Sequence, residues 1–156
     1  MNATLEVSNH APTALVGVPA QSVRILVVDD HADIRDLLSA ILEHDGYCVD
    51  SARDGESAWR VLQGSEYNLL VTDYIMPRMS GLALVRQMRV ASMALPVVMV
   101  SGNLDALDTE KLARDPWSRV DAFVRKPFSI RELLRAVHSA LMPKIAGHLT
   151  HGFAPA

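Results

Sequence analysis

The segment Asn68-Leu69-Leu70-Val71-Thr72-Asp73, followed by Tyr74-Ile75-Met76-Pro77, decides the fold of this chain. Its apolar part shows no helical period beyond three residues, which predicts a short strand buried on both faces, as in a parallel sheet. The strand has to end near the aspartate, because a proline cannot continue a central strand. Asp73 is therefore expected at the carboxyl edge of the sheet, where open α/β folds place their functional groups.

Three further apolar stretches, each followed by charged or hydroxyl residues, repeat this pattern: 24–28 before Asp29 and Asp30, 96–100 before Ser101, and 122–124 before Arg125 and Lys126. The carboxyl ends of parallel strands meet at one edge of a sheet. Three carboxylates, a hydroxyl and a lysine ammonium are therefore expected to converge there.

Helical periodicity fills the intervals between these strands. Apolar residues at three-and-four spacing predict helices at 34–42, 56–63, 82–88, 104–114 and 130–141, and residues 47–52 form a weaker strand. Ser129 and Glu132 have the spacing of a capping box, and Pro143 is expected to end the last helix. Five strand–helix units in alternation predict an α/β fold, a doubly wound parallel sheet with helices on both faces.

The length of 156 residues suits one domain. We expect a flexible N-terminal leader at 1–22, the domain at 23–142 and a C-terminal tail at 143–156. The single cysteine, Cys48, excludes an internal disulfide and is expected to be a buried thiol.

The charge pattern gives no reason to expect a nucleic-acid or membrane partner. The formal net charge is −3, and lysine and arginine form no run that would follow a phosphate backbone. No apolar run approaches the ~20 residues of a membrane span, and the first residues lack the basic start of a secretory signal. We expect a cytoplasmic protein.

Three converging carboxylates repel one another, and a bound cation is the simplest way to keep them ionised. An all-oxygen site suits Mg²⁺. Next to Mg²⁺, a carboxylate can attack phosphorus as a nucleophile, with Lys126 and Ser101 available to stabilise charge on the phosphoryl oxygens. The six histidines show no metal-ligand spacing and are expected at the surface.

The motifs match a known family when they are taken together: Leu26-Val27-Val28-Asp29-Asp30, Thr72-Asp73-Tyr74-Ile75-Met76-Pro77 with Ser80-Gly81, Val100-Ser101-Gly102, and Lys126-Pro127-Phe128. Over roughly 24–141 the chain resembles the receiver domains of two-component response regulators, of the single-domain, chemotaxis-regulator-like kind. The resemblance implies a flavodoxin-like (βα)5 sheet with strand order 2-1-3-4-5.

The same resemblance implies a role for each matching residue. Asp73 is the phosphoacceptor and takes its phosphoryl group from a phosphohistidine on a sensor histidine kinase or a histidine phosphotransfer protein. Mg²⁺ is held directly by Asp30, Asp73 and the main-chain carbonyl of Ile75, and through water by Asp29. Ser101 and Lys126 bind the phosphoryl group, and Phe123 lies at the position of the switch aromatic.

The implied protein is a signalling switch rather than an enzyme; it catalyses its own phosphotransfer and slow autodephosphorylation. Because the chain ends soon after Pro143, we expect no output domain, and output by contact with an unknown downstream protein or by onward phosphotransfer. The state expected is a monomer or a phosphorylation-dependent dimer. Two departures from the family bear on the output surface: Phe123 lacks a tyrosine hydroxyl, and 115–120 replaces a small turn.

Three alternatives stand beside this interpretation. One is a receiver-like scaffold that binds a partner without being phosphorylated. A dehalogenase-type phosphatase would carry a second acid two residues after its nucleophile, where this chain has Ile75. A nucleotide-binding flavodoxin-like protein would carry a glycine-rich loop after the first strand, and none follows residues 24–28.

Overall fold

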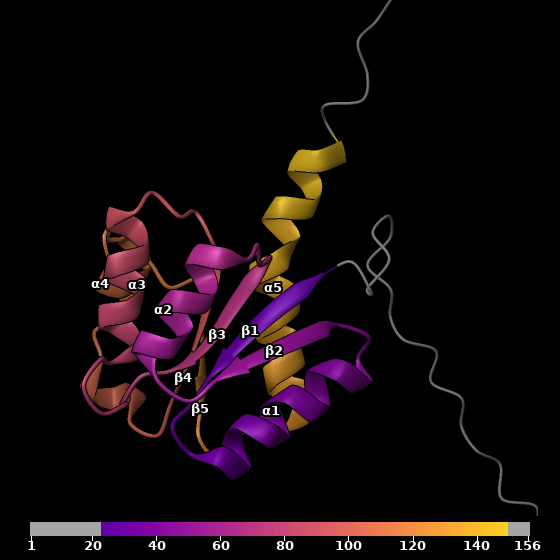
Figure 1. The fold of residues 1–156 in the computed structure, drawn as a ribbon, viewed down its shortest axis with the longest axis horizontal. Coiled ribbons are helices and arrows are strands. Elements are labelled where there is room, and N and C mark those ends of the chain that lie inside the picture. Colours follow the sequence, from indigo (N-terminus) through magenta and orange to yellow (C-terminus); the bar gives the residue numbers. More distant parts are fainter. Residues whose placement is uncertain (1–22, 150–156) are drawn as a thin grey trace, which may run out of the picture.

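The computed structural model describes residues 23–149, which form a five-stranded parallel sheet with helices on both faces (Figure 1). The elements in chain order are β1 (Arg24–Val28), α1 (Ala32–His44), β2 (Cys48–Ala52), α2 (Gly55–Gly64), β3 (Leu69–Asp73), α3 (Gly81–Val90), β4 (Val97–Ser101), the 3₁₀ helix η2 (Leu104–Ala106), α4 (Thr109–Arg114), β5 (Ala122–Arg125) and α5 (Ile130–Leu149). The strand order β2-β1-β3-β4-β5 confirms the predicted fold. The expected leader at 1–22 lies outside the described residues.

Alternate residues of the central strands belong to two separate cores. Ile25 and Val27 of β1 pack with residues of α1 and α5, whereas Leu26 and Val28 pack with residues of α2 and α3. Every residue of β3 is buried, which explains why its sequence is continuously apolar up to the final Thr72 and Asp73. The two cores fix the sheet between its helices, and so fix the strand ends that carry the polar residues.

Helices α2, α3 and α5 each begin at a side-chain oxygen that accepts the N–H three residues later: Asp54 from Ser57 at 2.7 Å, Ser80 from Ala83 at 3.1 Å, and Ser129 from Glu132 at 3.2 Å. The Glu132 carboxylate accepts the Ser129 N–H in return at 2.7 Å, which confirms the predicted capping box. Each of these helices starts just after a strand, so the caps anchor loops at the carboxyl edge of the sheet.

The prediction of one continuous helix over 104–114 is wrong. The structure has the short η2, followed by an α4 of six residues. The Asp108 carboxylate accepts the Lys111 N–H at 3.0 Å and so starts a new helix at Thr109. Asp115 precedes a proline and is extended, with ψ 117°, which ends α4 as expected from the interruption at 115–117.

Two further expectations are wrong. Helix α5 does not end at Pro143 but runs to Leu149, so the first part of the expected tail is helical. A proline removes one N–H donor from a helix without excluding the helix itself. Cys48 is exposed rather than buried, because it starts β2, which forms an edge of the sheet.

Among the described residues, no helix combines the length and the apolar character that crossing a membrane requires.

Candidate phosphoacceptor and metal site

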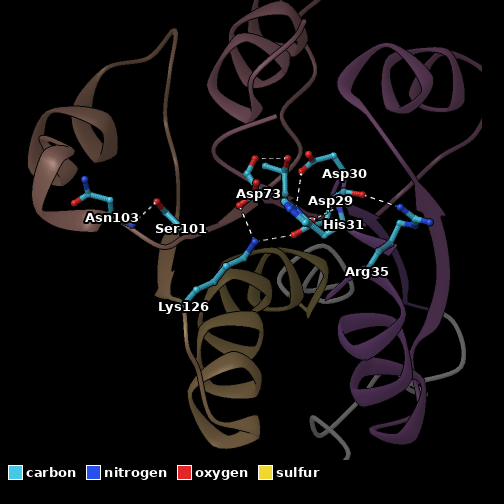
Figure 2. A network of polar contacts seen from close by, with 9 residues as sticks. Asp29, Asp30, His31, Arg35, Asp73, Ser101, Asn103 and Lys126 are labelled. Carbon is cyan, nitrogen blue, oxygen red and sulfur yellow. Dashed lines mark hydrogen bonds and ion pairs between the residues drawn. The ribbon is translucent and has the colours of Figure 1, made fainter. Parts of the chain in front are cut away.

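Side chains from three strands meet at the carboxyl edge of the sheet (Figure 2). The ammonium of Lys126, just after β5, donates to Asp29 Oδ2 at 2.9 Å and to Asp73 Oδ1 at 3.0 Å. Asp29 follows β1 and Asp73 ends β3, and these positions are 97 and 53 residues away from the lysine in sequence. The predicted convergence of these groups is therefore confirmed.

The main chain around Asp73 is held on both sides. Strand β3 pairs with β1 and β4, and the Tyr74 N–H continues this pairing by donating to the Val100 carbonyl at 2.9 Å. The loop returns so closely that the Gly81 N–H donates to the Tyr74 carbonyl at 3.0 Å. A Cβ on Gly81 would lie 2.0 Å from the Asp73 carbonyl oxygen, so only glycine fits at this close approach.

Asp29 is fully buried and has a partner on each carboxylate oxygen. Oδ2 accepts from Lys126, and Oδ1 accepts the His31 N–H at 2.9 Å. Its main-chain carbonyl accepts from the Arg35 guanidinium at 2.9 Å, which ties the end of β1 to the first turns of α1. These contacts hold the carboxylate in one orientation, facing the ammonium.

Asp30 lies beside this pair and has an unsatisfied oxygen. Its Oδ1 is buried and has no hydrogen-bond partner among the described residues. His31 Nδ1 lies 3.2 Å from this atom, close enough for an ion pair when the imidazole is protonated, but without the orientation of a hydrogen bond. A buried carboxylate oxygen without a donor is costly, and a bound cation is one way to satisfy it.

The electrostatics of the site oppose full ionisation. Burial raises the pKa of Asp73 above its ordinary value, and the charges of Asp29 and Asp30 raise it further, while Lys126 opposes both. Burial by itself would lower the pKa of Lys126, but hydrogen bonds and charge attraction from the two aspartates outweigh it, and the pKa is raised. The lysine therefore stays charged, and its single ammonium is shared between Asp29 and Asp73.

The residues present fit a divalent cation. Asp30 offers the unpartnered Oδ1, and Asp73 and Asp29 supply further carboxylate oxygens within the same network. Carboxylate oxygens with room for water suit Mg²⁺. The main-chain carbonyl of Ile75, the remaining predicted ligand, belongs to the loop just after β3, and the Ile75 side chain is 66% exposed.

The two predicted switch residues lie on the β4–β5 side of the site. Ser101 ends β4, is fully buried, and its Oγ accepts the Asn103 N–H at 3.2 Å. Phe123 is half-buried in β5 opposite Met99 of β4, and it borders a cavity of about 430 Å³ between β5 and α5. Ser101 thus lies in the sheet edge near the acids, while Phe123 lies further along the adjoining strand.

A cavity of about 580 Å³ opens at the opposite, amino edge of the sheet, lined in part by Arg24, Tyr67, Asn68 and Leu95. Asp50 at that edge accepts from Arg24 at 2.6 Å and from Tyr67 at 2.8 Å. These groups satisfy one another. Among residues 23–149, the buried side-chain oxygen without a hydrogen-bond partner lies at the carboxyl edge, and chemistry is expected there.

Sequence reasoning missed His31, which was expected to be an ordinary surface histidine. Its side chain is 71% exposed, yet its Nδ1 lies 3.5 Å from Asp29 Oδ1 as well as close to Asp30. The available signal was its position directly after the two aspartates, at the point where the strand ends and α1 begins.

A family model described as "Response regulator receiver domain" matches residues 25–138. The chain belongs to the response regulator receiver domain family. Response regulator MprA of Mycobacterium tuberculosis (strain H37Rv) is 35% identical to this receiver domain over 120 residues, which are 77% of this chain and 51% of MprA. The chain thus spans about half the length of the curated relatives it matches.

Solved receiver structures agree with this membership. The receiver domain of NtrX from Brucella abortus is 34% identical with a TM-score of 0.66, over 76% of this chain and 98% of that one. Response regulator TrrA from Thermotoga maritima, solved in complex with Mg²⁺-BeF, is 31% identical with a TM-score of 0.64, over 76% of this chain and 99% of that one. The match covers nearly the whole of each solved chain, so this chain shares the complete receiver fold with both.

Proposed function

We propose that Asp73 of this receiver domain accepts a phosphoryl group from a phosphohistidine, with Mg²⁺ as cofactor. The observation that carries the proposal is the contact of Lys126 with both Asp29 and Asp73, which sets a fixed ammonium beside a nearly buried carboxylate. The donor is a sensor histidine kinase or a histidine phosphotransfer protein. The Mg²⁺ complex of TrrA supports the cofactor.

In the transfer, a carboxylate oxygen of Asp73 forms a bond to phosphorus while the bond between phosphorus and the donor's imidazole nitrogen breaks. The electron pair of the broken bond stays on that nitrogen. Lys126 stabilises negative charge on the phosphoryl oxygens, since its raised pKa keeps it protonated. Ser101 accepts from Asn103 and so keeps its own O–H to donate to the phosphoryl group. Mg²⁺, when bound by Asp30, Asp73 and the Ile75 carbonyl, supplies charge neutralisation between the acids and the incoming group.

The output is a change of surface rather than turnover of a substrate. Lys126 and Ser101 lie at the ends of β5 and β4, and the Lys126 N–H donates to the Ser101 carbonyl at 2.8 Å. Movement of Ser101 toward a phosphoryl group therefore pulls on β5, which carries Phe123 and the cavity beside α5. A downstream protein reads this surface, or the phosphoryl group passes on to another histidine. Slow autodephosphorylation returns the switch to its resting state.

The test uses a small phosphodonor with and without Mg²⁺, followed by the intact mass of the protein. Wild type should gain one phosphoryl mass only with Mg²⁺, and Asp73→Asn should gain none. Asp36→Asn is the matched control, since this exposed aspartate of α1 lies outside the network and should leave the gain unchanged.

Absence of any gain in wild type would overturn the proposal and favour the scaffold that works without phosphorylation. A gain that persists in Asp73→Asn would place the acceptor elsewhere. The expectation of a regulator without an output domain rests on the length of the given chain alone. The part of this chain that matches MprA covers only 51% of MprA, so the absence of an output domain stays a prediction.

A further inference from the structure

The imidazole of His31 lies beside the two aspartates that follow β1 (Figure 2). Its Nδ1 is 3.2 Å from Asp30 Oδ1 and 3.5 Å from Asp29 Oδ1. Ligand-type atoms of these three consecutive residues all lie within 4.8 Å of one another. One of them, Asp30 Oδ1, is the buried oxygen that has no hydrogen-bond partner among the described residues.

These separations are those of ligands on a single ion. Two ligand atoms that are each about 2.1 Å from a metal are about 3.0 Å apart in an octahedral site and about 3.4 Å apart in a tetrahedral one. The 3.2 Å distance to Asp30 falls in this range, and the 3.5 Å distance to Asp29 lies just above it. The ring needs no rearrangement of the main chain to share an ion with the carboxylates.

We propose that His31 is a nitrogen ligand of the cation site and gives this receiver a preference for a first-row transition ion, such as Co²⁺ or Zn²⁺, over Mg²⁺. The inference rests on the proposed function for the oxygen ligands it shares. Imidazole binds transition ions well, whereas Mg²⁺ prefers oxygen and keeps its waters. His31 takes a place that water holds in an all-oxygen site.

The fold does not depend on this side chain. His31 precedes α1 as its N-cap, yet its side chain makes no capping hydrogen bond. The contact that orders the segment is the His31 main-chain N–H to Asp29, which any residue except proline provides. With 71% of the side chain exposed, the imidazole is accessible to ions from solvent, and its removal tests ligation rather than folding.

The experiment measures binding of Mg²⁺ alone and of Co²⁺ alone to the full chain by isothermal titration calorimetry, for wild type, His31→Ala and His44→Ala. His44 is an exposed histidine in the last turn of α1 and serves as the matched control. Asp30→Asn replaces the shared carboxylate with a neutral amide, so it should weaken Co²⁺ binding at this site but not at histidines elsewhere in the chain.

Wild type should bind Co²⁺ more tightly than Mg²⁺, and His31→Ala should weaken Co²⁺ binding by about tenfold or more while changing Mg²⁺ binding less than about twofold. His44→Ala should match wild type. An unchanged ratio of Co²⁺ to Mg²⁺ affinity in His31→Ala would overturn the inference, as would Co²⁺ binding that survives in Asp30→Asn at full strength.

The intact-mass assay with Mg²⁺ and a small phosphodonor separates this inference from the proposed function. That assay is run on wild type, with Asp73→Asn as the variant that should gain no phosphoryl mass. A protein that shows the His31-dependent Co²⁺ preference but never gains the mass would keep the metal assignment and lose the phosphoacceptor proposal. A protein that gains the phosphoryl mass but shows no His31-dependent Co²⁺ preference would support the phosphoacceptor proposal and overturn the metal assignment.

Discussion

Replacing Gly81 with alanine places a methyl group against the main chain of the candidate acceptor. The added Cβ would lie 2.0 Å from the Asp73 carbonyl oxygen and 3.1 Å from Thr72 Oγ1. The first distance is 1.4 Å short of the 3.4 Å at which ordinary contact begins. No flexible side chain can absorb this overlap, because the nearest atom belongs to the backbone of a strand that is paired on both sides.

The start of α3 therefore has to move away from β3 by about an ångström, which strains or breaks the Gly81 N–H bond to the Tyr74 carbonyl. Overpacking of this kind costs about 1–3 kcal/mol, and a lost hydrogen bond adds about 1 kcal/mol. We expect Gly81→Ala to lose about 3 kcal/mol of the free energy of unfolding, which lowers the melting temperature by about 10 °C. The domain should still fold, since domains have about 5–15 kcal/mol in all.

The assays are urea unfolding and the rate of phosphoryl incorporation. A displacement of about 1 Å near a reacting group can slow a reaction by about a hundredfold, so Gly81→Ala should lose rate as well as stability. Gly64→Ala is the control: Gly64 ends α2, nothing lies within 4 Å of its added Cβ, and its stability should be unchanged or slightly raised. If Gly81→Ala unfolded at the same urea concentration as Gly64→Ala, the close approach of α3 to β3 would be refuted.

Three other variants test separate contacts by urea unfolding. Asp54→Ala removes the cap of α2 and should cost about 1 kcal/mol. Hydrogen bonds from Ser57 hold the pKa of Asp54 below its ordinary value of 3.8. The stability that the Asp54 cap contributes is therefore fully present above pH 3.8 and is lost as the pH falls through the lower pKa of the folded state. The stabilities of Asp54→Ala and wild type should become equal in strong acid. Ser129→Ala opens the capping box of α5 and should cost about 1 kcal/mol at pH 7, whereas equal midpoints would show that α5 does not need it. Burial raises the pKa of Asp73 above 3.8, so its ionised form lowers stability; without Mg²⁺, Asp73→Asn should be the more stable at pH 7, and the difference should vanish as the pH falls to 3.8.

The positions of the site residues could be predicted because strand ends are visible in the sequence. A continuous apolar run that meets a polar residue marks both the strand and its carboxyl edge, and parallel strands bring these edges together. Asp29, Asp73 and Lys126 followed from that rule and meet as expected. The capping box at Ser129 followed from local spacing alone, since its bonds join residues three apart.

The errors concern features that spacing does not determine. Residues 104–114 have apolar positions suited to a helix. However, the Asp108 carboxylate accepts the main-chain N–H of Lys111 in place of a main-chain carbonyl, so a new helix starts at Thr109. Cys48 is exposed because β2 is an edge strand, which depends on the order of strands rather than on local sequence. His31 was missed because one of the two carboxylates beside it, Asp29, is held by Lys126, which is far away in the chain.

The charged residues of the site lower the folding stability of the domain, because burial opposes ionisation of Asp73. Three carboxylates face one ammonium, so two negative charges remain unbalanced when all are ionised, at a place where Asp29 is fully buried. A core of apolar residues at the same edge would be more stable. The two unbalanced negative charges equal the charge of a divalent cation. The Lys126 ammonium forms ion pairs with both Asp29 and Asp73 rather than with one of them. Under the proposed function, Lys126 would turn to the new anion on Asp73 while Asp29 keeps it in place, and its main-chain bond to the Ser101 carbonyl would pass that movement to β4 and β5. Under the proposed function, this unbalanced charge lies at the edge where the new charge on Asp73 would have to move two strands.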